Sequence, residues 1–413
     1  MRRIILLPIL SLTLALVACS TKTSTVMPPA SATVTNGQVE ALPSPVSGST
    51  DTPVSSTSTP PTSPPLPVLA SPALTRIYFQ DEYNGWGSAV NGNGYVVRTV
   101  DGGRTWLNAT PPGTGTIGYS ATLTVLNANA VWVLVPEANF FSGTLYRTSD
   151  GGITWSSALV PFGGAIIQFQ NGSTGRALAT REARDGSEAV ELFQTADGGV
   201  TWASVFHNDS SQPGASDSPP LEGIKNGMTF LDANTGWVTG SIPENGKVYL
   251  YVTHDGGVSW SQQSLPLPAG YADYRYLPQA PVFFGKDGFL PLIIYLPDHS
   301  GLTFYSTHDG GLSWSGDPTD VHKVIKPGLS AFGDPLHIWS WDGATTLYAT
   351  SDGAQMWEGV PASMDLNGRL SQLEFVPDST GHFTGWALTR VDEDGHSQLY
   401  RTSDGSTWTR LIP

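Results

Sequence analysis

Short apolar segments alternate with turn residues throughout residues 74–413, and the one long apolar run lies within the first twenty positions. Three segments share one order of positions: a Phe, a polar turn and a Gly-Trp pair. These segments start at Phe79, Phe230 and Phe375. A further apolar segment, such as residues 143–148, precedes a glycine-rich turn and another Trp. This order predicts four short strands in each unit: an inner strand, a second, a third and an outer one.

A phrase of the form Thr-x-Asp-Gly-Gly-x-Thr/Ser-Trp ends the third strand of each unit, with two degenerate copies at the C-terminal end. Its carboxylate can accept backbone N–H groups while the glycines adopt positive φ, so the phrase predicts a tight turn. A spacing of 43 to 58 residues between copies is typical of β-propeller blades. The sequence therefore predicts an all-β chain with a single seven-bladed propeller of four-stranded antiparallel blades over residues 74–413. The repeated residues are Asp101, Asp150, Asp197, Asp255, Asp309, Asp352 and Asp404.

The repeated phrase resembles the Asp-box, or BNR, repeat. That repeat is found in sialidase propellers, sortilin-type receptors, some glucanases and propellers of the photosystem II assembly-factor type. The Gly-Trp pair in the second strand and the Leu-Tyr-Arg-Thr run before the box, at residues 145–148 and 399–402, are most similar to the assembly-factor type. The resemblance implies that the boxes are structural and lie on the outer rim, away from the ligand face.

The two ends of the propeller decide how the ring closes. The chain is expected to enter the ring in an inner strand near residues 74–80 and to finish in an outer strand near residues 408–411. Closure would then depend on packing between blades more than on a shared strand. The sequence leaves open whether residues 66–73 add a closing strand.

The composition narrows the classes of protein and partner. The 413 residues include 46 Gly and 32 Pro, and only 13% are charged, which excludes a coiled coil, a helical bundle and a multi-span membrane protein. The formal net charge of −15 argues against a basic face that neutralises phosphates, so we expect no nucleic-acid partner.

The N-terminus resembles a bacterial lipoprotein signal. Two arginines precede an apolar segment that ends in Leu-Val-Ala-Cys19, the single cysteine of the chain. The resemblance implies cleavage after a signal peptide at residues 1–18 and acylation of Cys19, which would anchor the protein to a membrane at the cell surface or in the periplasm. An uncleaved anchor helix, or an ordinary signal with an incidental cysteine, is the alternative.

Residues 19–73 separate the anchor from the first blade. After Cys19 they are dominated by Ser, Thr and Pro, with Lys22, Glu40 and Asp51 as their charges. Such a segment buries too little apolar surface to offset its ordering entropy, so we predict a disordered tether.

No catalytic signature emerges from the sequence. A sialidase needs three arginines that converge on a carboxylate, whereas Arg98, Arg147 and Arg401 each stand three residues before a box Asp and so occupy equivalent positions on separate blades. Arg76 opens an Arg-Ile-Tyr phrase where sialidases carry Arg-Ile-Pro, but the Pro is missing. We assign no catalytic residue.

Cofactor and metal patterns are equally weak. Residues 113–118 spell GxGxxG, but they follow two prolines and precede no helical pattern, which argues against a dinucleotide site. The histidines show no metal-ligand spacing, and no loop has the clustered Asp residues of a dedicated calcium site. We expect no cofactor and no metal.

The predicted binding face is the one opposite the Asp boxes, where the 2–3 hairpins and the blade-to-blade loops leave the ring. Trp341 is the one tryptophan without a role in the repeat, and we interpret it as an exposed surface for stacking a ligand. Ordinary solvated loops are the alternative for every candidate. The candidates are Arg181, Glu182, Arg184, Asp185, Glu244, Tyr271, Asp273, Tyr274, Arg275, Tyr276, Asp298, His299, Trp341, Asp342, Asp392, Glu393 and Asp394.

These observations lead to one functional expectation and one alternative. We expect a monomeric, membrane-anchored binding or assembly lipoprotein that recognises a protein or a glycan through this face. The alternative is a glycoside hydrolase with a carboxylate pair on the same face, because sequence alone cannot supply the distance between two carboxylates.

Overall fold

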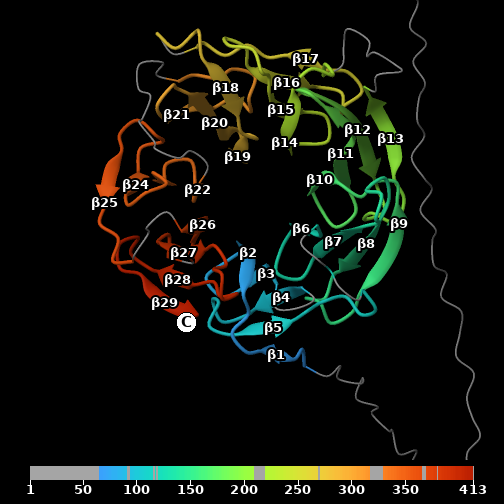
Figure 1. Cartoon of the computed structure of the whole chain (residues 1–413), viewed down its shortest axis with the longest axis vertical. Helices are drawn as coiled ribbons and strands as arrows, with labels where there is room; N and C mark the ends of the chain where they lie inside the picture. The colour runs from blue at the N-terminus through green and yellow to red at the C-terminus, as the bar shows by residue number, and fades with distance from the viewer. Residues whose placement is uncertain are drawn as a thin grey trace, which may run out of the picture. The chain divides into compact units, whose positions relative to one another are not determined.

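The computed structural model describes residues 65–90, 94–114, 117, 120–208, 219–267, 270–316, 329–364, 369–378 and 380–412. Within these ranges the regular elements are β-strands, and no α-helix occurs. The strands form seven antiparallel sheets arranged as the blades of a ring (Figure 1). This part of the chain is a seven-bladed β-propeller, as the repeat predicts. The predicted signal, Cys19 and the tether up to residue 64 lie outside the described residues.

In six blades the strands follow one another from the ring centre outward. Blade 1 contains β2 (Leu74–Phe79), β3 (Gly85–Ala89), β4 (Tyr95–Thr99) and β5 (Trp106–Asn108), and blade 2 contains β6 (Thr122–Val125), β7 (Val131–Pro136), β8 (Gly143–Thr148) and β9 (Ser156–Val160). Blade 3 contains β10 (Ala165–Phe169), β11 (Gly175–Arg184), β12 (Ser187–Thr195) and β13 (Ala203–His207), and blade 4 contains β14 (Ile224–Phe230), β15 (Gly236–Ser241), β16 (Tyr249–Thr253) and β17 (Ser261–Gln262). Blade 6 contains β22 (Ser330–Phe332), β23 (Ile338–Trp341), β24 (Leu347–Thr350) and β25 (Glu358–Val360), and blade 7 contains β26 (Leu370–Pro377), β27 (Phe383–Thr389), β28 (Leu399–Thr402) and β29 (Thr409–Ile412).

Blade 5 departs from this pattern because its inner strand is interrupted. β18 (Arg275–Pro278) and β19 (Val282–Phe284) both pair with β20 (Asp287–Tyr295), and Pro281 between them has no N–H to give to the ladder. On its other side β20 pairs with β21 (Ser300–Thr307). The outer strand is reduced to a single bridge between Ser306 and Ser315.

The ring closes between blades 7 and 1 through side chains. Gln372 of β26 accepts the Ile77 N–H at 2.9 Å and donates to the Ile77 carbonyl at 2.5 Å, and Glu374 accepts the Phe79 N–H at 2.8 Å. The extra strand β1 (Val68–Leu69) pairs with β5 on the outer edge of blade 1, so it adds a fifth strand to that blade and does not close the ring. The expected inner strand at the start of the ring and outer strand at its end are confirmed as β2 and β29, and β29 ends beside blade 1 (Figure 1).

Each repeated Asp organises the turn between the third and the outer strand. In blade 1, Asp101 accepts hydrogen bonds from the Thr105 N–H at 2.9 Å, from the Thr105 hydroxyl at 2.7 Å and from the Thr99 hydroxyl at 2.9 Å. Gly102 and Gly103 follow with φ of 75° and 91°, where a side chain would be strained. The acceptor role predicted for the Asp is confirmed. Asp150, Asp197, Asp255, Asp309, Asp352 and Asp404 accept corresponding bonds.

Stacked aromatic side chains connect several neighbouring blades. The ring of Phe79 in blade 1 stacks on Trp386 in blade 7 with centroids 3.7 Å apart, and the Trp386 N–H donates to the Gly102 carbonyl at 3.0 Å. The repeated Phe and Trp therefore form one inter-blade contact, which the sequence shows only as two separate positions. Stacking at centroid distances of 3.6 Å and 3.8 Å recurs for Phe169 on Trp132 and for Phe375 on Trp339.

Candidate functional site

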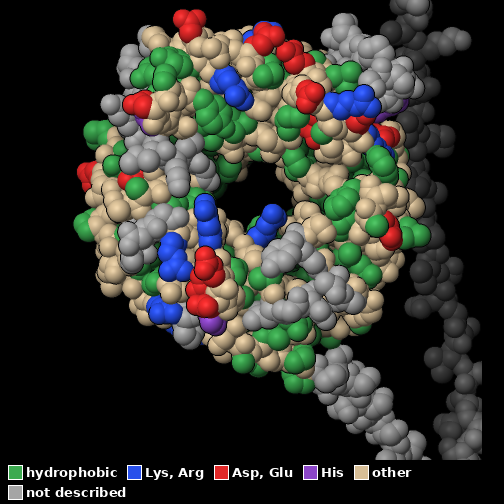
Figure 2. Space-filling model, viewed as in Figure 1, with side chains coloured by type: hydrophobic (Ala, Val, Ile, Leu, Met, Phe, Trp, Pro, Cys, Tyr) green, Lys and Arg blue, Asp and Glu red, His purple; other side chains and the backbone are tan. Residues whose placement is uncertain are grey.

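The strand order separates two faces of the ring. Because neighbouring strands are antiparallel, the 1–2 turns and the Asp-box turns leave at one end of the strands, which we call the box face. The 2–3 hairpins and the blade-to-blade connections leave at the other end, which we call the loop face. A central opening is visible in the space-filling view, with Lys and Arg side chains beside it (Figure 2).

The three arginines that precede the boxes have a structural role. Arg98 of blade 1 donates from Nη1 to the Gly151 carbonyl in the box of blade 2 at 3.0 Å. Arg401 of blade 7 donates to the Glu82 carbonyl of blade 1 at 3.5 Å, and Arg147 lies against Gly198 in the box of blade 3. Each arginine reaches the next blade, so the three do not converge. The prediction of a structural register instead of a substrate-binding triad is confirmed.

Blade 3 contains a variant of this contact that the sequence analysis missed. Arg176 replaces the second-strand Trp, is 1% exposed, and lies over the ring of Phe230 at 3.9 Å. Its guanidinium donates to the carbonyls of Gly256 and Ala233. The signal was present, because Arg176 follows a Gly at the position where other units have Gly-Trp.

The charged candidates of blade 3 form ion pairs on and beside the 2–3 hairpin. Arg181 contacts Glu191 at 2.6 Å, and Arg184 contacts Glu182. Glu182, Arg184 and exposed Asp185 line a pocket of about 280 Å³ together with buried Glu188. On this hairpin three predicted charged residues line a common cavity.

The candidates of blades 4 and 5 divide into exposed and buried residues. Exposed Glu244 pairs with Lys247 at 2.6 Å, and exposed Arg275 lies over the Tyr295 ring at 5.5 Å. Tyr276, in contrast, is 1% exposed and belongs to the core, so its placement on the binding face is wrong. Alternation along β18 turns Tyr276 inward and Arg275 outward. Tyr271 and Tyr274 are half-buried against the same core, Asp273 is exposed, and Asp298 contacts His299 at 2.6 Å.

The interpretation of Trp341 as an exposed stacking surface is wrong. Trp341 is 3% exposed and packs in the core between blades 6 and 7. Asp342 is 6% exposed and accepts the N–H groups of Ala344, Thr345 and Thr346 at 2.8 to 3.0 Å. Asp342 therefore supports the β23–β24 hairpin, because a buried carboxylate needs such donors.

Three exposed arginines gather at the loop-face ends of blades 7 and 1. Arg369 and Arg390 stand opposite each other, since the Arg390 N–H donates to the Arg369 carbonyl at 2.8 Å, and Arg76 lies in the neighbouring inner strand β2. Arg369 approaches Asp392 at 3.6 Å, while Arg76 and Arg390 have no carboxylate within salt-bridge distance among the described residues. Glu393 and Asp394 are exposed in the same hairpin. We call Arg76, Arg369 and Arg390 the arginine cluster.

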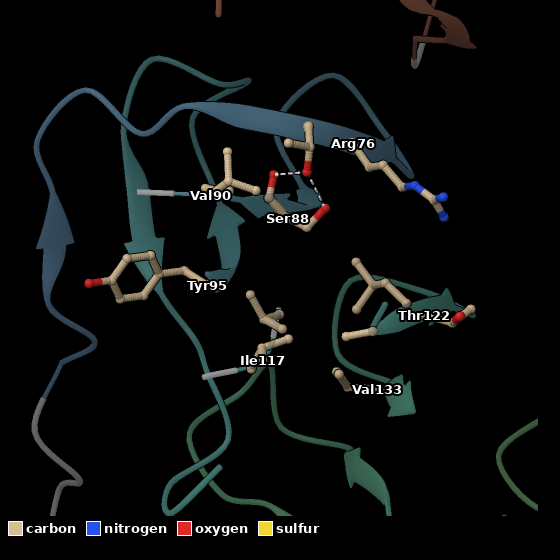
Figure 3. Close-up of a pocket in the computed structure, with 12 residues that line it drawn as sticks. Arg76, Ser88, Val90, Tyr95, Ile117, Thr122 and Val133 are labelled. Carbon is tan, nitrogen blue, oxygen red and sulfur yellow. Dashed lines mark hydrogen bonds between the residues drawn. The ribbon is translucent and has the colours of Figure 1, made fainter. Parts of the chain in front are cut away.

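A pocket of about 230 Å³ lies between blades 1 and 2 at this end of the strands (Figure 3). Its walls are mostly aliphatic, and the hydroxyls of Thr75 and Ser88 hydrogen-bond each other at 2.9 Å. In the close-up the Arg76 and Tyr95 side chains extend away from the cavity on opposite sides. Neither this pocket nor the arginine cluster was predicted from the sequence.

One buried carboxyl has a strongly raised pKa. Burial raises the pKa of Glu374 to about 8, although the Phe79 N–H and the Gln372 amide donate to it and act in the opposite direction. Gln168 makes the equivalent contact from blade 3, where it accepts the Phe230 N–H at 2.7 Å and donates to the Phe230 carbonyl at 3.1 Å. Glu374 is therefore a connector between blades.

Two absences hold for the residues that the structure describes. Among them no three His, Cys, Asp or Glu side chains gather as a metal site would require. In the same part of the chain no helix has the length and apolar character needed to cross a membrane.

Comparison with known proteins identifies fold relatives only. No protein-family profile and no curated protein matches the chain. Among solved structures, YCF48 bound to D1 peptide is similar at 17% identity and a TM-score of 0.50 over 81% of this chain and 94% of that one. YCF48 from Cyanidioschyzon merolae matches at 18% identity and a TM-score of 0.52, over 78% of this chain and 94% of that one.

A glycoside hydrolase is similar to the same extent. The GH74 xyloglucanase from Xanthomonas campestris matches at 15% identity and a TM-score of 0.54, over 84% of this chain and 55% of that one. At these identities the likeness is one of fold. The chain thus shares its fold with YCF48 and with a xyloglucanase.

Proposed function

We propose that the chain is an extracytoplasmic, lipid-anchored binding or assembly protein that recognises a protein partner through its loop face and acts as a monomer. The arginine cluster carries this proposal. A chain with 35 acidic and 20 basic residues places Arg76, Arg369 and Arg390 at one end of two neighbouring blades. An acidic segment of a partner protein complements such a surface.

The cluster is costly for the isolated propeller. Like charges that stand directly opposite each other across a strand pair are destabilising. Arg369 and Arg390 face each other just beyond the ends of β26 and β27, and Asp392 approaches Arg369. Local conflicts of this kind are typical of functional sites. The similarity to YCF48 bound to D1 peptide supports a protein ligand, since that propeller binds a peptide.

The test is a crosslinked pull-down of the full-length protein from its native membrane, with partners identified by mass spectrometry. Arg390→Glu should reduce recovery of a stoichiometric partner at least tenfold. Lys286→Glu makes the same change of charge in an exposed 1–2 turn on the box face and should leave recovery unchanged. Equal losses for both variants, or no stoichiometric partner, would contradict the proposal.

The anchor is tested separately. Cys19→Ala should abolish labelling by a fatty-acid analogue and release the protein from the membrane, because the cysteine is the proposed site of acylation. Unchanged labelling would refute the lipoprotein assignment and leave the binding proposal intact.

Glycan hydrolysis is the second candidate, favoured by the carboxylates around the 280 Å³ pocket of blade 3. Glu188 is occupied there, since it accepts the Thr180 hydroxyl at 2.7 Å and the Lys225 N–H at 2.6 Å, which leaves Glu182 and Asp185 for chemistry. Polysaccharide turnover that disappears in folded Asp185→Asn, and persists in Glu393→Gln, would establish hydrolysis in place of binding alone.

A further inference from the structure

The pocket between blades 1 and 2 has the chemistry of an apolar side-chain receptor. Its walls come from both blades: the aliphatic residues are Ala89, Val90, Val96, Ile117, Ala121, Leu123 and Val133. The hydroxyls of Thr75 and Ser88 satisfy each other, so they offer little to a sugar (Figure 3). What remains for recognition is apolar surface, whose release of water favours an apolar guest.

The charge at the rim is of one sign. No Asp or Glu lines the pocket, whereas exposed Arg76 does, and it makes no ion pair among the described residues. Its neighbour is half-buried Tyr78, and burial raises the pKa of the Tyr78 hydroxyl, which therefore carries no charge to neutralise the guanidinium. The Arg76 guanidinium extends away from the cavity (Figure 3), so it suits a carboxylate that lies beside the apolar guest and outside the pocket.

The size limits the guest. A volume of about 230 Å³ corresponds to about eight waters of liquid volume, which a single large side chain can displace. We propose that this pocket receives one large aliphatic side chain of the partner protein, and that Arg76 binds a carboxylate adjacent to that side chain in the partner's sequence. The proposal rests on the proposed function and deepens it, because it states what the partner presents.

Peptide probes test the pocket without knowledge of the partner. The probe is Gly-Asp-Leu-Asp-Gly in which photoactivatable diazirine-leucine replaces Leu, applied to the full-length protein, with crosslinks mapped by mass spectrometry. Labelling should fall on Ile117, Leu123 or Val133. Competition by the unmodified peptide should weaken about tenfold when its Leu is replaced by Ala and when both Asp residues are replaced by Asn.

Two variants fill the cavity. Ala121→Phe and Val90→Phe place an aromatic ring at the half-buried rim and should abolish labelling of the pocket. Ala183→Phe is the matched control, since Ala183 is exposed near the loop-face end of blade 3, and its labelling should equal that of the wild type. A melting temperature within 2 °C of the wild type shows that a variant is folded. One folded filling variant is enough to carry out the test.

The outcomes separate this inference from the proposed function. Labelling elsewhere, or full labelling of a folded filling variant, overturns the pocket proposal even where Arg390→Glu abolishes partner recovery. Pocket labelling that depends on Leu and Asp supports it even where no partner is recovered, and then the proposed function alone falls. Labelling that requires Leu but not Asp overturns the role of Arg76.

Discussion

Replacing Asp150 by Ala tests whether the boxes hold the ring together. Asp150 accepts the N–H groups of Thr154 and Ile153 at 2.9 Å and 3.1 Å, the Thr148 hydroxyl at 2.9 Å and the Thr154 hydroxyl at 2.5 Å. The turn that it supports presents the Gly151 carbonyl to Arg98 of blade 1. Loss of the carboxylate therefore weakens both a turn and a contact between blades.

The magnitude follows from the number and exposure of these bonds. Four hydrogen bonds to a charged acceptor are lost, but most involve exposed groups that water can satisfy in the variant. At the lower end of the usual range for each bond, we expect the free energy of unfolding to fall by about 1–3 kcal/mol. Asp150→Asn keeps one acceptor oxygen and should lose about half as much.

The assay is urea unfolding followed by tryptophan fluorescence, which reports on the 13 tryptophans. Glu393→Ala is the matched control, because it removes an exposed carboxylate from the loop face. Its unfolding midpoint should equal that of the wild type. Equal midpoints for Asp150→Ala and Glu393→Ala would show that the box carboxylate does not support the turn.

Three further predictions concern pH and backbone strain. The Ser313 hydroxyl, its N–H and the Thr307 hydroxyl lower the pKa of Asp309 to about 2 from an ordinary 3.8, so the stability that the boxes provide should be present above about pH 4 and disappear toward pH 2 in a melting-temperature series. The raised pKa of Glu374 has the opposite effect: the stability that this carboxyl contributes is complete below about pH 4.5 and is lost as the pH rises through 8. The melting temperature of Glu374→Gln should therefore vary less between pH 5 and 9 than that of the wild type. A fall in melting temperature at alkaline pH as large as that of the wild type would contradict this. Ala354 replaces the second box Gly with φ of 70°, so Ala354→Gly should raise the free energy of unfolding by about 1 kcal/mol, as measured by urea unfolding, and a fall would disprove strain there.

The candidate face shows where sequence reasoning reaches its limit. The sequence placed charged hairpins such as residues 181–185 at the correct end of the strands, because that follows from antiparallel order alone. It assigned Tyr276 and Trp341 to the surface, because loop-like sequence does not reveal the side to which a strand-end residue turns. It missed the arginine cluster because Arg76 and Arg369 are 293 positions apart and come together only when blade 7 meets blade 1.

The repeat by itself determined the number of blades, the place of the box turns and the ends of the ring, since each depends on local hydrogen bonding and strand order. The box Asp accepts its hydrogen bonds within its own turn, so the eight-residue phrase was enough to predict its role. The tertiary structure decided how the blades join, because the joining contacts link distant segments. Phe79 stacks on Trp386, Gln372 hydrogen-bonds to Ile77, and Arg98 hydrogen-bonds to the box of the next blade. The pocket between blades 1 and 2 has the same origin, because neither blade forms both of its walls.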